Sequence, residues 1–242
     1  MSSNAELHLT YKIVNAPFNA FPYPHLYIRD AFPADYYARM QSMLPDPSRL
    51  VNLSDLGRMA PGQYKERFVM ALGGDKLPAL TDEQRAFWTE LHGWLVGGAF
   101  RQRMIEHFRG LLAQRFKGKM VAFFDEALLV QDTTNYSLGP HSDAPRKVIT
   151  FLFYLPKDES QRHLGTSLYV PKDRSFRCQG GPHYPHAQFD RVWTMPFLPN
   201  SLFIFLKTDT SFHGVEPVQD PDTRRWLLLY DIFHQLASPS PQ

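Results

Sequence analysis

The sequence predicts an α+β fold in which helices precede an antiparallel β-sandwich or jelly roll. Between residues 81 and 112, apolar side chains recur at three- and four-residue spacing, which is typical of amphipathic helices. After residue 117 the chain changes to short apolar runs separated by Gly, Pro and Asp, which is typical of antiparallel strands. We therefore expect residues 1–242 to form one domain, with a mixed N-terminal region over 1–118 and a β core over 119–234.

The N-terminal region begins with alternating structure. The segment 25–32 (HLYIRDAF) predicts a strand, and 33–44 predicts a helix that has Pro33 near its start. Residues 45–65 are polar and interrupted by Pro and Gly, so they predict a loop that could form one wall of a site. Residues 67–72 (RFVMAL) predict another strand.

The helical part of the N-terminal region has its own start signal. Thr81 and Gln84 have the spacing of a capping box, in which each side chain bonds the backbone of the other residue. The apolar stripe that follows predicts one helix or a pair of helices, with a break at Gly97-Gly98. We expect these helices to support the core by packing.

The β core is predicted to contain a series of short strands separated by turns. The expected strands are 119–131, 146–155, 166–170, 190–195, 201–206, 214–218 and 225–233. Between two of them, residues 172–191 form a long stretch without periodicity. Loops of this length inside a compact domain are often functional, and this one can serve as a substrate-facing lid.

Composition excludes several classes of function. The formal charge of +2 gives no reason to expect nucleic acid or an anionic membrane as a partner, and the longest apolar run is too short to span a bilayer. A single cysteine, Cys178, excludes an internal disulfide framework and a cysteine-rich zinc site. The N-terminus lacks the pattern of a secretory signal, so a cytoplasmic location is the simplest expectation.

A candidate metal site lies at the mouth of the apolar run Val148–Leu155. A Gly-Pro turn is followed by His141, one serine, and Asp143. On extended backbone, residues two apart point to the same side, so the imidazole and the carboxylate can meet one ion. Random placement of 10 histidines and 16 aspartates already predicts somewhat fewer than one such triplet, so the pair alone has little weight.

Residues further along the chain support a metal-binding role for His141 and Asp143. His213 lies between two strand-like runs, and Arg224 opens the apolar run that follows it. Two histidines and one carboxylate leave coordination positions open, which suits non-haem Fe(II). An arginine at the start of an apolar strand needs an anionic partner, such as a dicarboxylate or the nearby Asp220 or Asp222.

These motifs, taken in order, resemble the iron(II)- and 2-oxoglutarate-dependent dioxygenases, in particular the prolyl-4-hydroxylase-like branch. The resemblance covers residues 120–233 and includes FLFYLPKD (151–158), GTSLYVP (165–171) and HGVEPV followed by RRWLLLY. In the second motif Thr166 replaces the family's second glycine. The resemblance implies a double-stranded β-helix core, cupin-like in form, behind N-terminal supporting helices.

The resemblance also implies a function and a set of site residues. His141, Asp143 and His213 would hold Fe(II), and Tyr154 and Arg224 would bind the far carboxylate of 2-oxoglutarate, with O2 as the other co-substrate. We favour Arg224 and keep Arg225 as the alternative, because QDPDT lengthens the interval after His213. The carboxylate of Asp143 favours hydroxylation, since halogenases of the family lack it. The implied reaction releases succinate and CO2.

Several alternatives stay open at this stage. The substrate is expected to be a small molecule, such as an amino acid or a natural-product intermediate, with a protein side chain as the alternative. The chain could instead be a cupin-like metalloprotein that does not use 2-oxoglutarate, or a binding module without catalysis. His183 and His186 could form a second metal site, but Pro185 lies between them and no carboxylate is near in sequence. The oligomeric state is not predicted.

Overall fold

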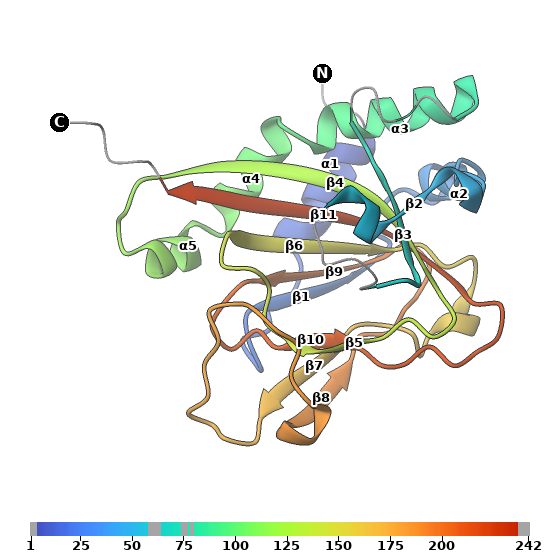
Figure 1. Ribbon diagram of the computed structural model, residues 1–242. Coiled ribbons are helices and arrows are strands. Elements are labelled where there is room, and N and C mark those ends of the chain that lie inside the picture. The colour runs from blue at the N-terminus through green and yellow to red at the C-terminus, as the bar shows by residue number, and fades with distance from the viewer. Residues whose placement is uncertain (1–3, 58–63, 74–76, 78–79, 237–242) are drawn as a thin grey trace.

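Two antiparallel sheets face each other in the computed structural model, which describes residues 4–57, 64–73, 77 and 80–236 (Figure 1). The larger sheet has the strand order β1-β9-β6-β11-β4-β3-β2, and the smaller has the order β5-β10-β7-β8. The strands of the larger sheet are β1 (His25–Arg29), β2 (Val51–Asn52), β3 (Arg67–Ala71), β4 (Val121–Thr133), β6 (Lys147–Tyr154), β9 (Ser201–Leu206) and β11 (Arg224–Leu236). Those of the smaller are β5 (Leu138–His141), β7 (Ser167–Pro171), β8 (Phe189–Thr194) and β10 (His213–Val215).

Helices cover the face of the larger sheet that points away from the smaller one (Figure 1). They are α1 (Asn4–Val14), α2 (Ala34–Ser42), α3 (Asp82–Leu95), α4 (Ala99–His107) and α5 (Arg109–Phe116), with short 3-10 turns at Pro47–Arg49, Leu53–Leu56, Glu159–Gln161 and His186–Gln188. Trp88, Phe100 and Phe151 are wholly buried in the core between these helices and the sheet. None of the helices within the described ranges is long and apolar enough to cross a membrane.

Strand alternation divides β11 between two environments. Trp226, Leu228 and Tyr230 pack into the core under the helices. The residues between them, Arg225, Leu227, Leu229 and Asp231, line a cavity between the two sheets. Successive side chains on a strand point to opposite faces, so one register decides which arginine at the start of β11 enters the cavity.

Most elements agree with the sequence predictions, and the capping box of Thr81 and Gln84 is confirmed. The predicted break at Gly97-Gly98 is also present, because Gly97 has a φ of 74° between α3 and α4. The prediction of one or two helices in this stretch is wrong, because the structure has three: α3, α4 and α5. The region expected as a loop, 45–65, contains β2 and two 3-10 turns, and its residues 58–63 lie outside the described part.

Two further elements were not predicted. The helix α1 buries a narrow face of Ala5, Leu9 and Ile13, while Leu7 and Tyr11 on the same helix stay exposed. Apolar residues on both faces obscure the helical period in the sequence. The strand β5 has only four residues and includes Gly139 and Pro140, which are typical of turns. Its pairing with β10 makes it a strand.

Candidate metal centre and its cavity

The predicted trio of His141, Asp143 and His213 converges at one end of the smaller sheet. His141 is the last residue of β5 and pairs in register with His213, the first residue of β10, while Asp143 follows two residues after His141. One ligand atom from each side chain lies within 4.8 Å of the others. Within the described ranges, no other group of histidine, cysteine and acidic residues has this geometry. These three side chains can therefore hold a single metal ion.

Backbone carbonyls set the orientation of both imidazoles. His141 Nδ1 lies 3.0 Å from the Gly139 carbonyl oxygen, and His213 Nδ1 lies 3.0 Å from the Ser211 carbonyl oxygen. A carbonyl can only accept, so Nδ1 carries the hydrogen and Nε2 keeps its lone pair for a metal. Burial lowers the pKa of both rings, and for His141 the neighbouring His213 lowers the pKa further. Neutral rings are the form that binds metal.

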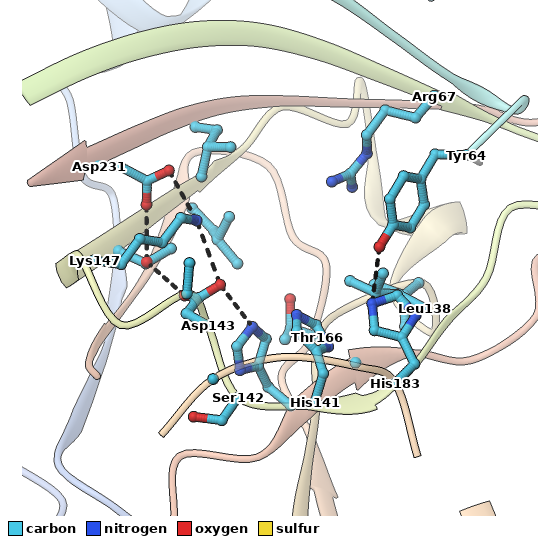
Figure 2. A pocket seen from close by; sticks show the side chains of 18 of the residues that line it. Tyr64, Arg67, Leu138, His141, Ser142, Asp143, Lys147, Thr166, His183 and Asp231 are labelled. Atoms are coloured by element: carbon cyan, nitrogen blue, oxygen red, sulfur yellow. Dashed lines mark hydrogen bonds and ion pairs between the residues drawn. The ribbon is translucent and has the colours of Figure 1, made fainter. Parts of the chain in front are cut away.

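A buried polar network holds the carboxylate of Asp143 (Figure 2). Lys147 Nζ lies 3.4 Å from Asp143 Oδ1 and 2.9 Å from Asp231 Oδ2. The Thr150 hydroxyl lies 3.0 Å from Asp143 Oδ2 and 2.8 Å from Asp231 Oδ1. Burial raises the pKa of Asp143, but the charge of Lys147, the two histidines and the Thr150 hydrogen bond together outweigh burial, so the pKa is lowered and the carboxylate is ionised.

Removing the Thr150 hydroxyl is expected to weaken metal binding while the fold is retained. Thr150→Val keeps the shape of the side chain but frees Asp143 Oδ2, so the carboxylate loses part of its fixed orientation. Loss of such a supporting contact typically lowers metal affinity by about 10- to 100-fold. Isothermal titration with Mn(II) measures the effect. The control is Thr223→Val, which removes a hydroxyl donated to the Asp220 carbonyl in its own turn; equal affinities for the two variants would contradict the role of Thr150.

A cavity of about 890 Å³ extends from the metal centre between the two sheets. This volume is within the usual range for small-molecule sites. The cavity is lined by both sheets and by loop residues; those used below are Leu53, Tyr64, Arg67, Thr166, His183 and Arg225. It therefore joins the three candidate ligands to the start of β11.

The structure places Arg225, the alternative, in the cavity wall and leaves the preferred Arg224 outside it. Arg224 is exposed and lies outside the cavity lining, whereas Arg225 is 1% exposed and lines it. The reason is register: Arg225 pairs with Asp132 of β4, which places the odd-numbered residues of β11 on the cavity side. Arg224 instead shares the face of Trp226, as expected from alternation, and that face belongs to the helix side of the sheet.

Three charged residues form a ladder across neighbouring strands at the far end of the cavity. Asp132 of β4 pairs in register with Arg225 of β11 on one side and with Arg67 of β3 on the other. Its carboxylate, wholly buried, accepts a bond of 2.6 Å from Arg225 Nη1 and bonds of 2.7 and 3.0 Å from Arg67. The Arg67 guanidinium also lies 4.4 Å from the centre of the Tyr136 ring. The ladder carries two positive charges and one negative charge.

Tyr154 lies behind the cavity wall. It is fully buried, and its hydroxyl donates to Thr166 Oγ1 at 2.8 Å and accepts from the Thr166 amide at 3.2 Å. Thr166 lines the cavity, and Tyr154 does not. Gly165, the residue before Thr166, has no room for a side chain, because a Cβ there would lie 1.5 Å from the Met195 carbonyl oxygen. The Thr166 hydroxyl hydrogen is left free for a ligand.

The predicted loop 172–191 contributes to the cavity through its middle part. His183 lies with its ring centre 4.7 Å from that of His141, and the Tyr64 hydroxyl is 2.8 Å from His183 Nε2 (Figure 2). The His183 and Tyr64 side chains therefore meet beside the metal centre. His186 instead contacts the ring of Tyr169, so the structure does not bring His183 and His186 together as a second metal site.

Sequence reasoning missed the charged residues that surround the predicted ligands. Lys147 opens β6 and Thr150 is the polar residue inside its apolar run, and their closeness in sequence to Asp143 was the available signal. Arg67 and Asp132 gave no such signal, since they are 65 residues apart in sequence and meet only by strand pairing.

Comparison with known proteins gives a fold relationship. No protein-family model matches the chain, and no curated protein matches its sequence. Among solved structures, prolyl 4-hydroxylases from Phytophthora capsici match with a TM-score of 0.50 at 13% identity, over 99% of this chain and 69% of that one. A 2OG-Fe(II) oxygenase family oxidoreductase from Burkholderia pseudomallei has a TM-score of 0.47 at 12% identity, over 96% and 91%. A Pseudomonas putida prolyl-4-hydroxylase has 0.47 at 13%, over 95% and 99%. The Phytophthora match shows a shared fold.

Proposed function

We propose that this chain is an Fe(II)- and 2-oxoglutarate-dependent oxygenase whose two facing sheets form a double-stranded β-helix. It hydroxylates an unactivated C–H bond of a small molecule and releases succinate and CO2. The observation that carries the proposal is the placement of a buried guanidinium, Arg225, in the same cavity as the trio of His141, Asp143 and His213. The iron, when bound, supplies the oxygen chemistry, and the protein supplies ligands, a shaped cavity and charge.

The charges at the metal centre and at the ladder, considered apart from the other charged lining residues Glu66, Glu126 and Arg146, match a dicarboxylate bound to a divalent ion. A divalent ion with one carboxylate ligand leaves one net positive charge, which the chelating carboxylate of 2-oxoglutarate would neutralise. The ladder of Arg225, Asp132 and Arg67 also carries one net positive charge, which the far carboxylate would neutralise. Lys147 and Asp231 balance each other. Buried charges need such partners, so a dicarboxylate satisfies both ends of the cavity.

Thr166 and Arg225 are the proposed residues for the far carboxylate. Arg225 Nε donates to the Leu164 carbonyl and Nη1 to Asp132, which leaves Nη2 for a ligand. The Tyr154 hydroxyl supports Thr166, because it donates to Oγ1 and leaves the threonine hydrogen free. Tyr154 thus contacts Thr166 and not the ligand itself, whereas the resemblance implied a direct contact with the far carboxylate.

The size of the cavity supports a small molecule as the proposed substrate class. Its volume of about 890 Å³ is in the usual range for small-molecule sites. Tyr64 and His183, which come from two separate segments, line it and meet beside the metal centre, so they are the proposed contacts for the substrate.

Anaerobic titration with 2-oxoglutarate tests the proposed function. The protein loaded with Fe(II) should bind one equivalent of 2-oxoglutarate and develop a visible charge-transfer band, and admission of O2 should yield succinate. Protein without metal should show no band. If the loaded protein binds no 2-oxoglutarate and releases no succinate, the proposal is wrong, and a metalloprotein with another co-substrate becomes the better account.

A further inference from the structure

We infer that Arg67 joins Arg225 in attracting the far carboxylate of 2-oxoglutarate. Arg67 lies outside the strands that carry the metal ligands, and it supplies the net positive charge that Arg225 alone lacks. The inference rests on the proposed function and adds a binding residue to it. It follows from the way in which Asp132 is shared between two guanidiniums.

Arg225 by itself is a neutralised cation. Its Nη1 lies 2.6 Å from Asp132 Oδ2, both side chains are 1% exposed or less, and its Nε is occupied by the Leu164 carbonyl. A pair buried this closely has no net charge. An incoming carboxylate would meet the attraction of Arg225 together with the repulsion of the adjacent Asp132, so this pair alone is a weaker anion site than an unpaired guanidinium.

Arg67 restores the missing charge. Its guanidinium binds Asp132 through two atoms, Nε at 2.7 Å and Nη2 at 3.0 Å, and its side chain is 15% exposed. The residue lies on the cavity wall, as does Arg225 (Figure 2 shows Arg67). Among the residues that the structure describes, neither Arg67 Nη1 nor Arg225 Nη2 has a hydrogen-bond partner. Two unused donors and one excess positive charge thus meet at the same end of the cavity.

This arrangement assigns a binding role to the N-terminal region. Arg67 comes from β3, and its position is fixed by the register between β3 and β4, in which Arg67 pairs with Asp132. The carboxylate pocket is therefore assembled by two parts of the chain that are distant in sequence. A carboxylate ligand is attracted by two guanidiniums and is oriented by both.

Binding measurements on substituted proteins distinguish two roles of Arg67: attracting the ligand by its charge, or only holding Asp132 in place. Mn(II)-loaded protein without O2 is titrated with 2-oxoglutarate and with 2-oxopentanoate, which has the same chelating end but no far carboxylate. For Arg67→Gln we expect a rise of roughly 10- to 100-fold in the Kd for 2-oxoglutarate, from the loss of one nearby charge, and no change for 2-oxopentanoate. Arg67→Lys keeps the charge and should stay within about fivefold of the unsubstituted protein.

A double substitution tests the charge arithmetic directly. In the variant Arg67→Gln with Asp132→Asn, one positive charge is again in excess, so the Kd for 2-oxoglutarate should return most of the way to its starting value. The control is Arg101→Gln, which breaks a comparable ion pair with Asp125 outside the cavity lining. Thermal unfolding and Mn(II) affinity are measured on each protein.

The outcomes are distinguishable. If the unsubstituted protein binds no 2-oxoglutarate, the proposed function is wrong and this inference with it. If it binds but Arg67→Gln binds equally well, Arg67 has no part in the pocket. If Arg67→Lys loses as much affinity as Arg67→Gln and the double substitution restores nothing, Arg67 only supports Asp132, and the inference is overturned. Should Asp132→Asn prevent folding, the lysine and glutamine variants still decide the question.

Discussion

Replacing Asp143 with alanine is expected to abolish tight metal binding and, with it, any oxygenase activity. Asp143 is the sole anionic member of the trio, and its carboxylate lies within 4.8 Å of both histidine ligand atoms. Without it, two neutral imidazoles remain, and Lys147 adds a positive charge beside the ion. We expect metal affinity to fall by at least about 1,000-fold, since the loss combines a ligand with a charge.

The fold should survive the Asp143→Ala substitution. Lys147 keeps its partner Asp231 at 2.9 Å, so no buried charge is left alone. Circular dichroism and Mn(II) titration, performed on the same samples, check the two parts of this prediction. Asp209→Ala is the control, because Asp209 is an exposed carboxylate outside the large cavity. Unchanged Mn(II) affinity in Asp143→Ala would contradict the assignment of the metal centre.

Replacing Arg225 with glutamine is expected to abolish 2-oxoglutarate binding at physiological concentrations and to leave the metal in place. The guanidinium bonds to Leu164 and Asp132 and to none of the three metal ligands, so the trio should bind Mn(II) as before. Loss of charged hydrogen bonds worth about 1.5–3 kcal/mol each should raise the Kd for 2-oxoglutarate by about 100-fold or more. Calorimetric titration of the Mn(II)-loaded protein measures this.

The adjacent residue provides a matched control. Arg224→Gln removes the same charge one position away, from an exposed side chain on the helix side of β11, and it should bind 2-oxoglutarate like the unsubstituted protein. Arg225→Gln should lower the free energy of unfolding only modestly, since Asp132 keeps both of its bonds to Arg67. Equal Kd values for the two variants would place the far carboxylate elsewhere in the cavity.

The sequence predicted the strands of the core well because each is short, apolar and bounded by turn residues. The run 201–206 matches β9 to the residue, and Val148–Leu155 matches β6 closely. The three candidate ligands could be chosen from the sequence because His141 and Asp143 adjoin a strong strand and His213 lies between two others. Their convergence is visible only in the structure, through the pairing of β5 with β10.

The charged surroundings of the site could not be predicted in the same way. Alternation shows that Arg224 and Arg225 face opposite sides, but only the pairing of β11 with β4 shows which side is the cavity. Arg67 and Asp132 meet through strand pairing across 65 residues of sequence, which no local pattern reveals. Tyr64 and His183, 119 residues apart, meet through a side-chain hydrogen bond between two loops, which the sequence does not reveal either. Long-range pairing thus supplies what local periodicity cannot.

Crystallographic anomalous scattering from Mn(II), in protein crystallised with 2-oxoglutarate and without O2, tests the central claim most directly. The account predicts one peak at bonding distance, about 2.0–2.3 Å, from His141, Asp143 and His213, by analogy with other oxygen and nitrogen ligands. It also predicts 2-oxoglutarate reaching from that peak to Arg225. A peak away from these side chains, or a far carboxylate pointing away from Arg225, would contradict the account.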